Sequence, residues 1–328
     1  MCSDCKLQGW PVRVLMPGLL FLLLFITGCS IRSLAVNAVA DALTSGSADV
    51  YASDDDPELV GQALPFGLKT IESLLQAKPT HPGLLIAAAS GFVQYTYGYV
   101  LLPAENTRFT DIKNWRLARK RAKRLFLRAR DYGLRALELR SPGFTSLIRK
   151  DPERAVLAFK KKDVEALYWT GVAWASAISM AKDDMDLVGD LSAVDALMNR
   201  ALELDETWGE GALHEFYIAY SMSRNEATEA NLKEAEKHFK RAMELNGGRS
   251  IGPLVSYAEN ICVKTQNRKK FKALLQQALA FDVDQFPEKR LTNILAQKKA
   301  AMLLSNIENL FFVEEGEMEP ALRETKSK

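Results

Sequence analysis

The 328-residue sequence predicts an all-α protein. Apolar residues recur three and four positions apart, for example at Leu68, Ile71 and Leu75, and this is the period of one face of a helix. Strand signals are scarce, because few alternating β-branched runs are bounded by turn residues, and Asn246-Gly247 is the main hairpin candidate. A short sequence phrase that is typical of the end of a helix also recurs along the chain, so the helices are expected to form repeats.

The repeated phrase identifies the kind of helical array. It occurs as LLQAKP at 74–79, RALELR at 135–140, RALELD at 200–205, RAMELN at 241–246 and QALAFD at 277–282. Ala235, Phe239 and Ala242 fit the second helix of a tetratricopeptide (TPR) hairpin, whose regular period is about 34 residues. The copies are unevenly spaced and only the last approach that period. The sequence therefore predicts a perturbed TPR-like helical hairpin array, an α-solenoid with extra helices.

Each copy of the phrase follows a candidate first helix. These helices are expected at 81–102, 163–181, 209–223, 251–265 and 287–312. The whole helical body is expected to begin at Asp56-Pro57, because Asp is a good N-cap and Pro is favoured at the first helical position.

The N-terminus has the pattern of an export signal that ends at a cysteine. Lys6 and Arg13 precede an apolar run, Leu19 to Ile26, which is too short to span a bilayer and is typical of a signal peptide. The sequence Ile26-Thr27-Gly28-Cys29 resembles the bacterial lipobox, whose cysteine is acylated when the signal is removed. We therefore predict lipidation at Cys29 and a periplasmic location on the inner or outer membrane. An ordinary signal peptide with a chance cysteine is the alternative.

These features divide the chain into four segments. We expect a signal peptide at 1–28, a lipidated N-terminus and tether at 29–55, the helical domain at 56–313 and a disordered tail at 314–328. Cys2 and Cys5 fall in the discarded segment, so their spacing is not interpreted as a metal or redox motif. The 43 basic and 41 acidic residues are balanced, which excludes a dominant polyanionic partner.

Several longer phrases together resemble one family. They are DPELVGQALPFGLKTIESLLQAKPTHPGLL (56–85), LYWTGVAWASAIS (167–179), GALHEFYIAY (211–220), HFKRAMELNGGRS (238–250) and FKALLQQALAFD (271–282). They are similar to the TatT family, the TPR-containing T components of TRAP-type transporters. The resemblance covers most of residues 33–312. It implies an all-helical homotrimer with a central pore that is a periplasmic lipoprotein. It also implies that the protein acts together with a TRAP substrate-binding protein and a sodium-coupled permease.

Two long uncharged stretches hold the candidate contact residues. Residues 84–102 contain no charge, and we interpret them as a buried helix rather than a second membrane span. Residues 166–181 repeat the pattern. Within such helices some side chains are expected to line a groove or pore or to contact a partner, although burial with a local hydrogen-bond partner is the alternative for each one. The candidates are Tyr95, Tyr97, Tyr99, Trp169, Trp174, Tyr217 and Tyr220.

The spacing of these aromatic residues limits their directions. Tyr95, Tyr97 and Tyr99 cannot share one helix face, since residues two apart point in different directions. Trp169 and Trp174 are five apart and also lie on different sides, so one is expected in the core and the other in an apolar groove.

The segment 113–130 holds nine basic residues and no acidic residue. Its candidate basic surface is formed by Arg116, Arg119, Lys120 and Lys123. Export excludes nucleic acid as a partner. A solvated helix face, contact with lipid headgroups, and an electropositive funnel for an organic anion remain open.

No motif indicates an enzyme. His214-Glu215 lacks the second histidine of H-E-x-x-H, and neither His81 nor His238 has metal-binding partners in the sequence. We expect no metal, cofactor or catalytic residue. The predicted function is a lipid-anchored transport accessory that docks a TRAP substrate-binding protein and passes a small hydrophobic or carboxylate ligand. The alternative is a TPR lipoprotein scaffold in envelope assembly that has no ligand.

Overall fold

The computed structural model describes residues 47–223 and 228–312. All regular elements in these two ranges are helices and none is a strand, which confirms the all-α prediction. The predicted signal peptide, Cys29 and the predicted C-terminal tail at 314–328 lie outside the described residues.

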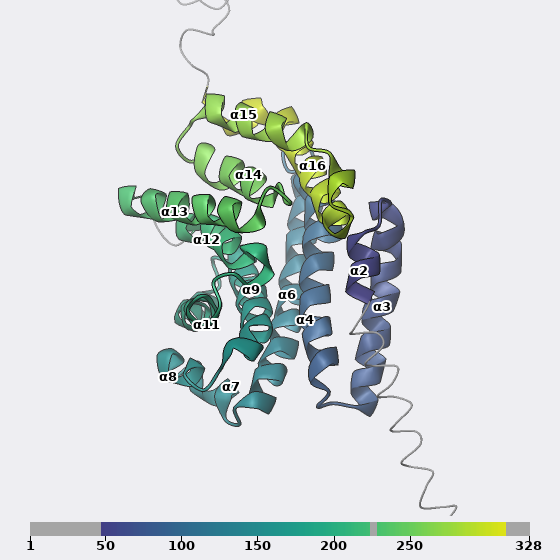
Figure 1. The fold of residues 1–328 in the computed structure, drawn as a ribbon, viewed down its shortest axis with the longest axis vertical. Helices are drawn as coiled ribbons and strands as arrows, with labels where there is room; N and C mark the ends of the chain where they lie inside the picture. The colour runs from purple at the N-terminus through teal and green to yellow at the C-terminus, as the bar shows by residue number, and fades with distance from the viewer. Residues whose placement is uncertain (1–46, 224–227, 313–328) are drawn as a thin grey trace, which may run out of the picture.

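The first half of the chain forms a layer of long helices that lie side by side (Figure 1). It contains α3 (Pro57–Ala77), α4 (Pro82–Tyr95), α6 (Ile112–Arg140) and α9 (Val164–Met180). Helix α4 continues through the π-helical segment η1 (Thr96–Leu101) into α5 (Leu102–Glu105). Contacts run from α3 to α4, from α4 to α6 and from α6 to α9, so each helix covers the next.

The second half stacks shorter helices onto this layer. They are α11 (Leu191–Leu204), α12 (Ala212–Ser223), α13 (Glu229–Asn246), α14 (Gly252–Tyr257), its π-helical continuation η4 (Ala258–Cys262), α15 (Arg268–Leu279) and α16 (Arg290–Ser305). Helix α12 packs on α13, and α14 packs on α15, as antiparallel hairpins do. The TPR-like nature of these hairpins stays a prediction.

Short helices fill the connections. They are α2 (Ser47–Ala52), α7 (Phe144–Leu147), α8 (Pro152–Val156), η2 (Lys161–Asp163), α10 (Met185–Val188), η3 (Trp208–Glu210), η5 (Val283–Gln285), η6 (Pro287–Lys289) and α17 (Ile307–Leu310). Helices α7 and α8 lie between the second and third copies of the repeated phrase, where the spacing exceeds the regular period.

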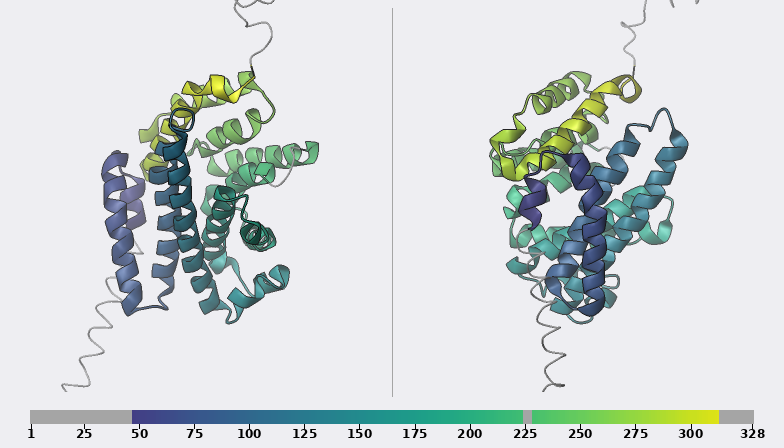
Figure 2. Two further views of the ribbon diagram at one scale, coloured as in Figure 1. Left: turned by 180° about the vertical axis from the view of Figure 1, so that it is seen from behind. Right: turned by 90° about the vertical axis from the view of Figure 1, so that its right-hand side faces the viewer.

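The last helices return to the first ones. Helix α16 contacts both α2 and α3, and a guanidinium nitrogen of Arg290 donates to the carbonyl of Ser53 at 2.9 Å. Figure 2 shows α16 crossing over the end of the first layer. The chain therefore curls back on itself, which an open solenoid does not do.

The local signals explain most helix ends. Asp56 caps α3 by accepting from the backbone N–H groups of Glu58 and Leu59 at 2.9 and 3.0 Å. Gly247 ends α13 in the left-handed conformation, with φ of 59°, which glycine adopts most easily. The supposed hairpin signal at Asn246-Gly247 is therefore a helix C-cap. All five repeated phrases lie at helix ends, as expected.

Two boundaries differ from the sequence expectation. Residues Ser47–Ala52 of the predicted tether form α2, which packs on α16, because the segment has a surface to pack against. The expected helix at 287–312 is divided into η6, α16 and α17, and Asn306 ends α16 by donating its side-chain amide to the carbonyl of Met302 at 2.9 Å.

The uncharged helix is an internal element of the first layer. Pro82–Glu105 is the single helical stretch among the described residues that is long and apolar enough to cross a membrane. It packs on α3, α6 and α9, and Leu84 and Leu85 are completely buried. This packing supports its interpretation as a central helix of the array.

Candidate functional site

Polar side chains from five helical segments meet inside the array. They belong to η1, α9, α12, η4 and α16, and the residues are Tyr97, Tyr168, Ser176, Glu215, Glu259 and Lys299. We call this group the central polar cluster. Titratable groups so far apart in sequence interact here in one place, which makes the cluster a candidate site.

Tyr97 is the most accessible member of the central polar cluster. Its side chain is 46% exposed, and its hydroxyl lies 2.8 Å from the hydroxyl of the buried Ser176. Ser176 donates its own proton to the Val172 carbonyl at 2.6 Å, so Tyr97 is the donor of the pair. Burial of the hydroxyl end raises the pKa of Tyr97. One end of the residue therefore meets solvent and the other is fixed in protein.

Lys299 and Glu259 form an ion pair in the same place. The ammonium lies 2.5 Å from a carboxylate oxygen, and each side chain is about one-third exposed, at 34% and 33%. Burial lowers the pKa of Lys299, but the attraction of Glu259 outweighs it and the net pKa is raised. The cluster therefore holds one permanent cation that is already paired.

Glu215 is the unusual member of the cluster, because no hydrogen bond is assigned to its carboxyl group. Burial raises the pKa of Glu215 to about 7, against the opposing attraction of Lys299 and Lys289. The carboxyl group lies against Gly252, where a Cβ atom would be only 2.4 Å from Oε1. The absence of a side chain at position 252 therefore makes room for this carboxyl group.

Both π-helical segments contribute to the cluster. Tyr97 comes from η1 and Glu259 from η4. A π-helical turn inserts a residue into an α-helix and changes the direction of the side chains around it, and such turns are frequent at functional sites. This coincidence is a second reason to place the candidate site here.

Tyr95 and Tyr99 lie away from Tyr97. Their rings stack with centroids 6.0 Å apart, and the Tyr95 hydroxyl accepts from Arg121 at 3.2 Å. The Tyr99 ring occupies the space beside Gly61 of α3. The structure thus separates the three tyrosines and brings Tyr97 alone into the central polar cluster.

The remaining aromatic candidates are mostly core residues. Trp174 is completely buried, whereas Trp169 is half-buried and packs edge-on against Tyr168 of the cluster at 5.0 Å. The hydroxyl of Tyr217 donates to Asn199 at 2.6 Å, and that of Tyr220 donates to Asp195 at 2.8 Å. Both tyrosines are buried, so their hydroxyls fix α12 against α11.

The four candidate basic residues divide into two pairs. Arg119 donates to the Ser179 carbonyl at 2.9 Å, and Lys123 pairs with Asp184 at 2.8 Å. Arg116 and Lys120 are exposed. Only the second pair therefore remains available on the surface of α6.

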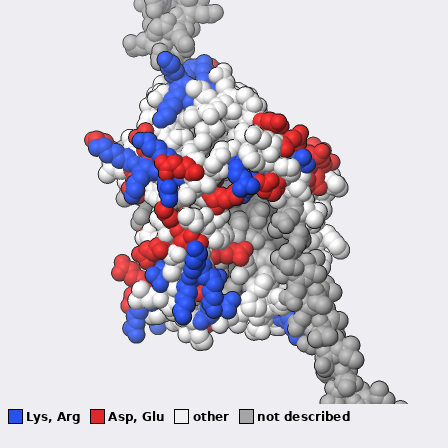
Figure 3. Space-filling model, viewed as in Figure 1, with Lys and Arg blue, Asp and Glu red and all other residues white. Residues whose placement is uncertain are grey.

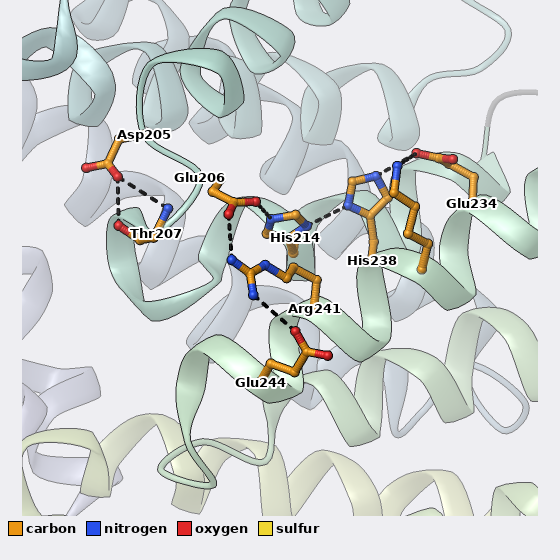
Figure 4. Close-up of polar contacts among 9 residues, drawn as sticks. Asp205, Glu206, Thr207, His214, Glu234, His238, Arg241 and Glu244 are labelled. Atoms are coloured by element: carbon orange, nitrogen blue, oxygen red, sulfur yellow. Dashed lines mark hydrogen bonds and ion pairs between the residues drawn. The ribbon is translucent and has the colours of Figure 1, made fainter.

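A second polar group joins α12 to α13 (Figure 4). His214 and His238 are buried, and their Nδ1 atoms are 2.8 Å apart. His238 Nε2 lies 2.9 Å from Glu234, whereas His214 Nε2 lies 3.4 Å from Glu206. Glu206 also pairs with Arg241 at 2.5 Å.

These distances fit one pair of neutral tautomers. His238 donates from Nε2 to Glu234, so its Nδ1 accepts the Nδ1 proton of His214. His214 Nε2 then has a free lone pair, in agreement with its lack of a hydrogen-bond partner. Burial lowers the pKa of both histidines, and Glu206 and Glu234 oppose this effect while the positive charge of Lys237 adds to it. The described residues hold no cluster of three potential metal ligands.

We expect the histidine pair to make folding weaker in acid. Because the folded pKa values are lowered, the unfolded chain binds more protons below about pH 6.5, so the stability contributed by the pair is present above that pH and lost as the pH falls. The measurement is urea unfolding of wild type and the double variant H214Q/H238Q between about pH 7.5 and about pH 5. The wild type should lose more stability than the variant over this range. H81N, which keeps an N-capping side chain, is the control and should follow the wild type; equal slopes for all three proteins would contradict the expectation.

Sequence reasoning missed both polar groups. Glu215 and His214 are neighbours in a helix that gives no motif, and their partners come from other helices. The only available signal was the isolated charge of Glu215 within the otherwise uncharged phrase at 211–220.

The comparison with known families identifies the family of the chain. Residues 53–311 match the profile of TAtT, described as TRAP transporter T-component. The chain belongs to the TRAP transporter T-component family. The match includes every residue of the central polar cluster, and the family is one of transporter components rather than enzymes.

A second comparison adds one relative of this T-component. An uncharacterized protein of Treponema pallidum (strain Nichols) is 28% identical over 305 residues, which cover 88% of this chain and 94% of the relative. The similarity therefore extends over nearly the full length of both chains. Membership in a TRAP transporter family also indicates a location in the cell envelope.

Proposed function

We propose that this T-component is a lipid-anchored periplasmic subunit that docks the substrate-binding protein of a TRAP transporter and holds a small ligand at the central polar cluster. The observation that supports ligand binding most strongly is the half-buried Glu215, whose carboxyl group has no assigned hydrogen bond and is close enough to Tyr168 for its charge to raise the pKa of that tyrosine. A scaffold without a ligand has no need for such a group, since unpaired polar groups in an interior lower stability.

The cluster offers two kinds of contact to a ligand. The rings of Tyr97, Tyr168 and Trp169 offer apolar area, and the Tyr97 ring is accessible to solvent. Lys299 and the protonated form of Glu215 can each donate a hydrogen bond to a carboxylate. These chemical features favour a ligand with an apolar body and a carboxylate head, within the predicted class of hydrophobic or carboxylate ligands.

Ligand binding is tested by native mass spectrometry of the purified full-length lipoprotein. The wild type should release a copurified small molecule. The double variant K299M/E259Q, which removes both charges of the ion pair together, should release none. K298M, a change at the exposed neighbouring lysine, is the control and should resemble the wild type. An empty wild-type protein would favour the scaffold alternative.

Partner docking and anchoring need separate measurements. Affinity capture from native membranes after mild crosslinking should recover a TRAP substrate-binding protein, and its absence at native expression would contradict docking.

Metabolic labelling with radioactive palmitate should label the wild type and not Cys29→Ser. Label in the variant, or none in the wild type, would contradict lipidation at this residue.

The proposed homotrimer has a candidate surface on α3. Leu59 and Phe66 are 57% and 79% exposed, and residues seven apart share a helix face. Apolar side chains exposed in this way are typical of protein interfaces. Light scattering should give three copies for the wild type and one for L59E/F66E. K162E, at an exposed lysine of η2, is the control and should stay trimeric; a monomeric wild type would contradict the trimer.

A further inference from the structure

The outer face of α6 is an unpaired basic stripe. Four of its cations are exposed and have no ion pair or hydrogen bond assigned to their side chains: Lys113, Arg116, Lys120 and Arg124. At 3.6 residues per turn they fall within a sector of roughly 80° and extend along roughly 16 Å of the helix. No acidic residue lies between Asp111 and Asp131, so nothing on this face of the helix neutralises them. We call these four residues the α6 basic stripe.

The other cations of α6 have internal roles. Arg119 and Lys123 contact α9 and the loop after it, as described above. Arg128 lies over the Phe92 ring and near Glu72, and Arg130 pairs with Asp131 at 2.8 Å. Folding therefore accounts for these residues. It does not account for the α6 basic stripe, whose side chains have no assigned ion pair or hydrogen bond that would stabilise the fold.

Exposed apolar side chains lie at the start of the stripe and within it. Phe109, Ile112 and Leu117 are 43%, 49% and 59% exposed. Leu117 borders a shallow hollow of about 320 Å³ that also includes Tyr99 and Arg121. The view from behind in Figure 2 shows α6 on the side of the molecule opposite to the one drawn in Figure 3, where both signs of charge are mixed. Cations beside exposed apolar groups are typical of proteins that lie on a membrane surface.

We propose that the α6 basic stripe binds the surface of an anionic phospholipid bilayer. This inference rests on the lipid anchor of the proposed function. Cys29 is 18 residues before the first described residue, Ser47, and a chain of that length reaches at most about 60 Å. The tether thus keeps the body close to a bilayer and allows α6 to meet it. At such a high local concentration a weak attraction between Lys or Arg and anionic headgroups is sufficient.

A small soluble anion is a poorer occupant for this surface. The four cations point outward from one helix, and none of them lines the hollow beside Leu117. A flat anionic surface can contact all four cations at once, together with Leu117, and a single small anion cannot. The extent of the stripe therefore favours a bilayer.

The test measures vesicle binding without the anchor. It uses the chain from residue 29 onward with Cys29→Ser, which keeps every described residue and cannot be acylated. Vesicles of phosphatidylglycerol and phosphatidylcholine are compared with vesicles of phosphatidylcholine alone in a sedimentation assay. Because no acyl chain is present and no partner protein is added, the result is independent of anchoring, docking and ligand binding.

The variants isolate the stripe from total charge. The test variant is K113Q/R116Q/K120Q/R124Q. The control removes four exposed lysines elsewhere: K162Q/K240Q/K269Q/K272Q. Circular dichroism checks that both variants fold, and single changes at Lys120 and Arg124 replace the fourfold variant if it does not.

The proposal predicts a specific pattern. The wild type should bind the anionic vesicles at least about tenfold more tightly than the neutral ones, and added salt should weaken that binding. The stripe variant should lose about tenfold in affinity and the control should change by less than about twofold. Equal binding to both kinds of vesicle, or equal losses in both variants, would overturn it. If the stripe variant loses only an acidic protein partner in the capture experiment while vesicle binding is unchanged, the surface is a protein interface and the proposal is wrong.

Discussion

Replacing Trp174 by alanine is expected to lower the free energy of unfolding by about 3 to 5 kcal/mol, the usual cost of removing a large aromatic side chain from a core. Trp174 is the largest completely buried side chain of the described residues. Its indole N–H donates to Asp190 at 3.2 Å, and the guanidinium groups of Arg130 and Arg149 lie 5.2 and 5.7 Å from its ring centre. The cavity would therefore open where α9 packs on α11 and α6.

Two further variants separate the causes of this loss. W174F keeps a ring in the core but removes the indole donor, and it should cost about 1 to 2 kcal/mol because Asp190 still pairs with Arg149 at 3.2 Å. W169A, in the same helix but half-buried, should lose less than half as much stability as W174A. Urea unfolding followed by circular dichroism measures all three. Similar losses in W174A and W169A would show that the packing at Trp174 is not as described.

The sequence was sufficient to predict the helices because the signals for them are local. The apolar period, the Asp56 cap and the five repeated phrases all act within a few residues, and each is found where a helix begins or ends. The segment at Ser47–Ala52 was expected to be a tether, since its composition is polar and its own propensity is weak. It becomes a helix because α16 provides a surface, and that surface is created by a contact more than 200 residues away.

The candidate site could be predicted only in part, for the same physical reason. The sequence indicated that the three tyrosines of α4 and η1 cannot share a face, but it could not indicate that Tyr97 alone reaches Ser176. Glu215 and Lys299 are separated by more than 80 residues, and their meeting depends on how α16 folds back over the first layer. His214 and His238 likewise depend on the register between α12 and α13. The basic residues of α6 were visible in the sequence, but only the structure divides them into internal and exposed ones.

Replacing Glu215 by glutamine is expected to remove a pH-dependent loss of stability. Burial raises the folded pKa of Glu215 from 4.5 to about 7, so between these values the folded protein keeps a proton that the unfolded chain has released. The stabilisation is fully present below pH 4.5 and is lost as the pH rises through 7. A shift of this size corresponds to about 3 kcal/mol. Glutamine has the shape of the protonated side chain and cannot ionise.

The measurement is the free energy of unfolding of wild type and E215Q between about pH 5 and about pH 8. The histidine pair changes stability in the opposite direction over part of this range, so the difference between the two proteins is the informative quantity. As the pH rises, the free energy of unfolding of E215Q should increase relative to that of the wild type by about 3 kcal/mol. E153Q changes an exposed glutamate of α8, and its free energy of unfolding should run parallel to that of the wild type. If E215Q also runs parallel, Glu215 is ionised throughout, and its carboxyl group cannot donate a hydrogen bond to a carboxylate ligand. If E215Q gains as expected, the cluster contains a neutral acid near pH 7, and that is the form in which a carboxylate can approach it without charge repulsion.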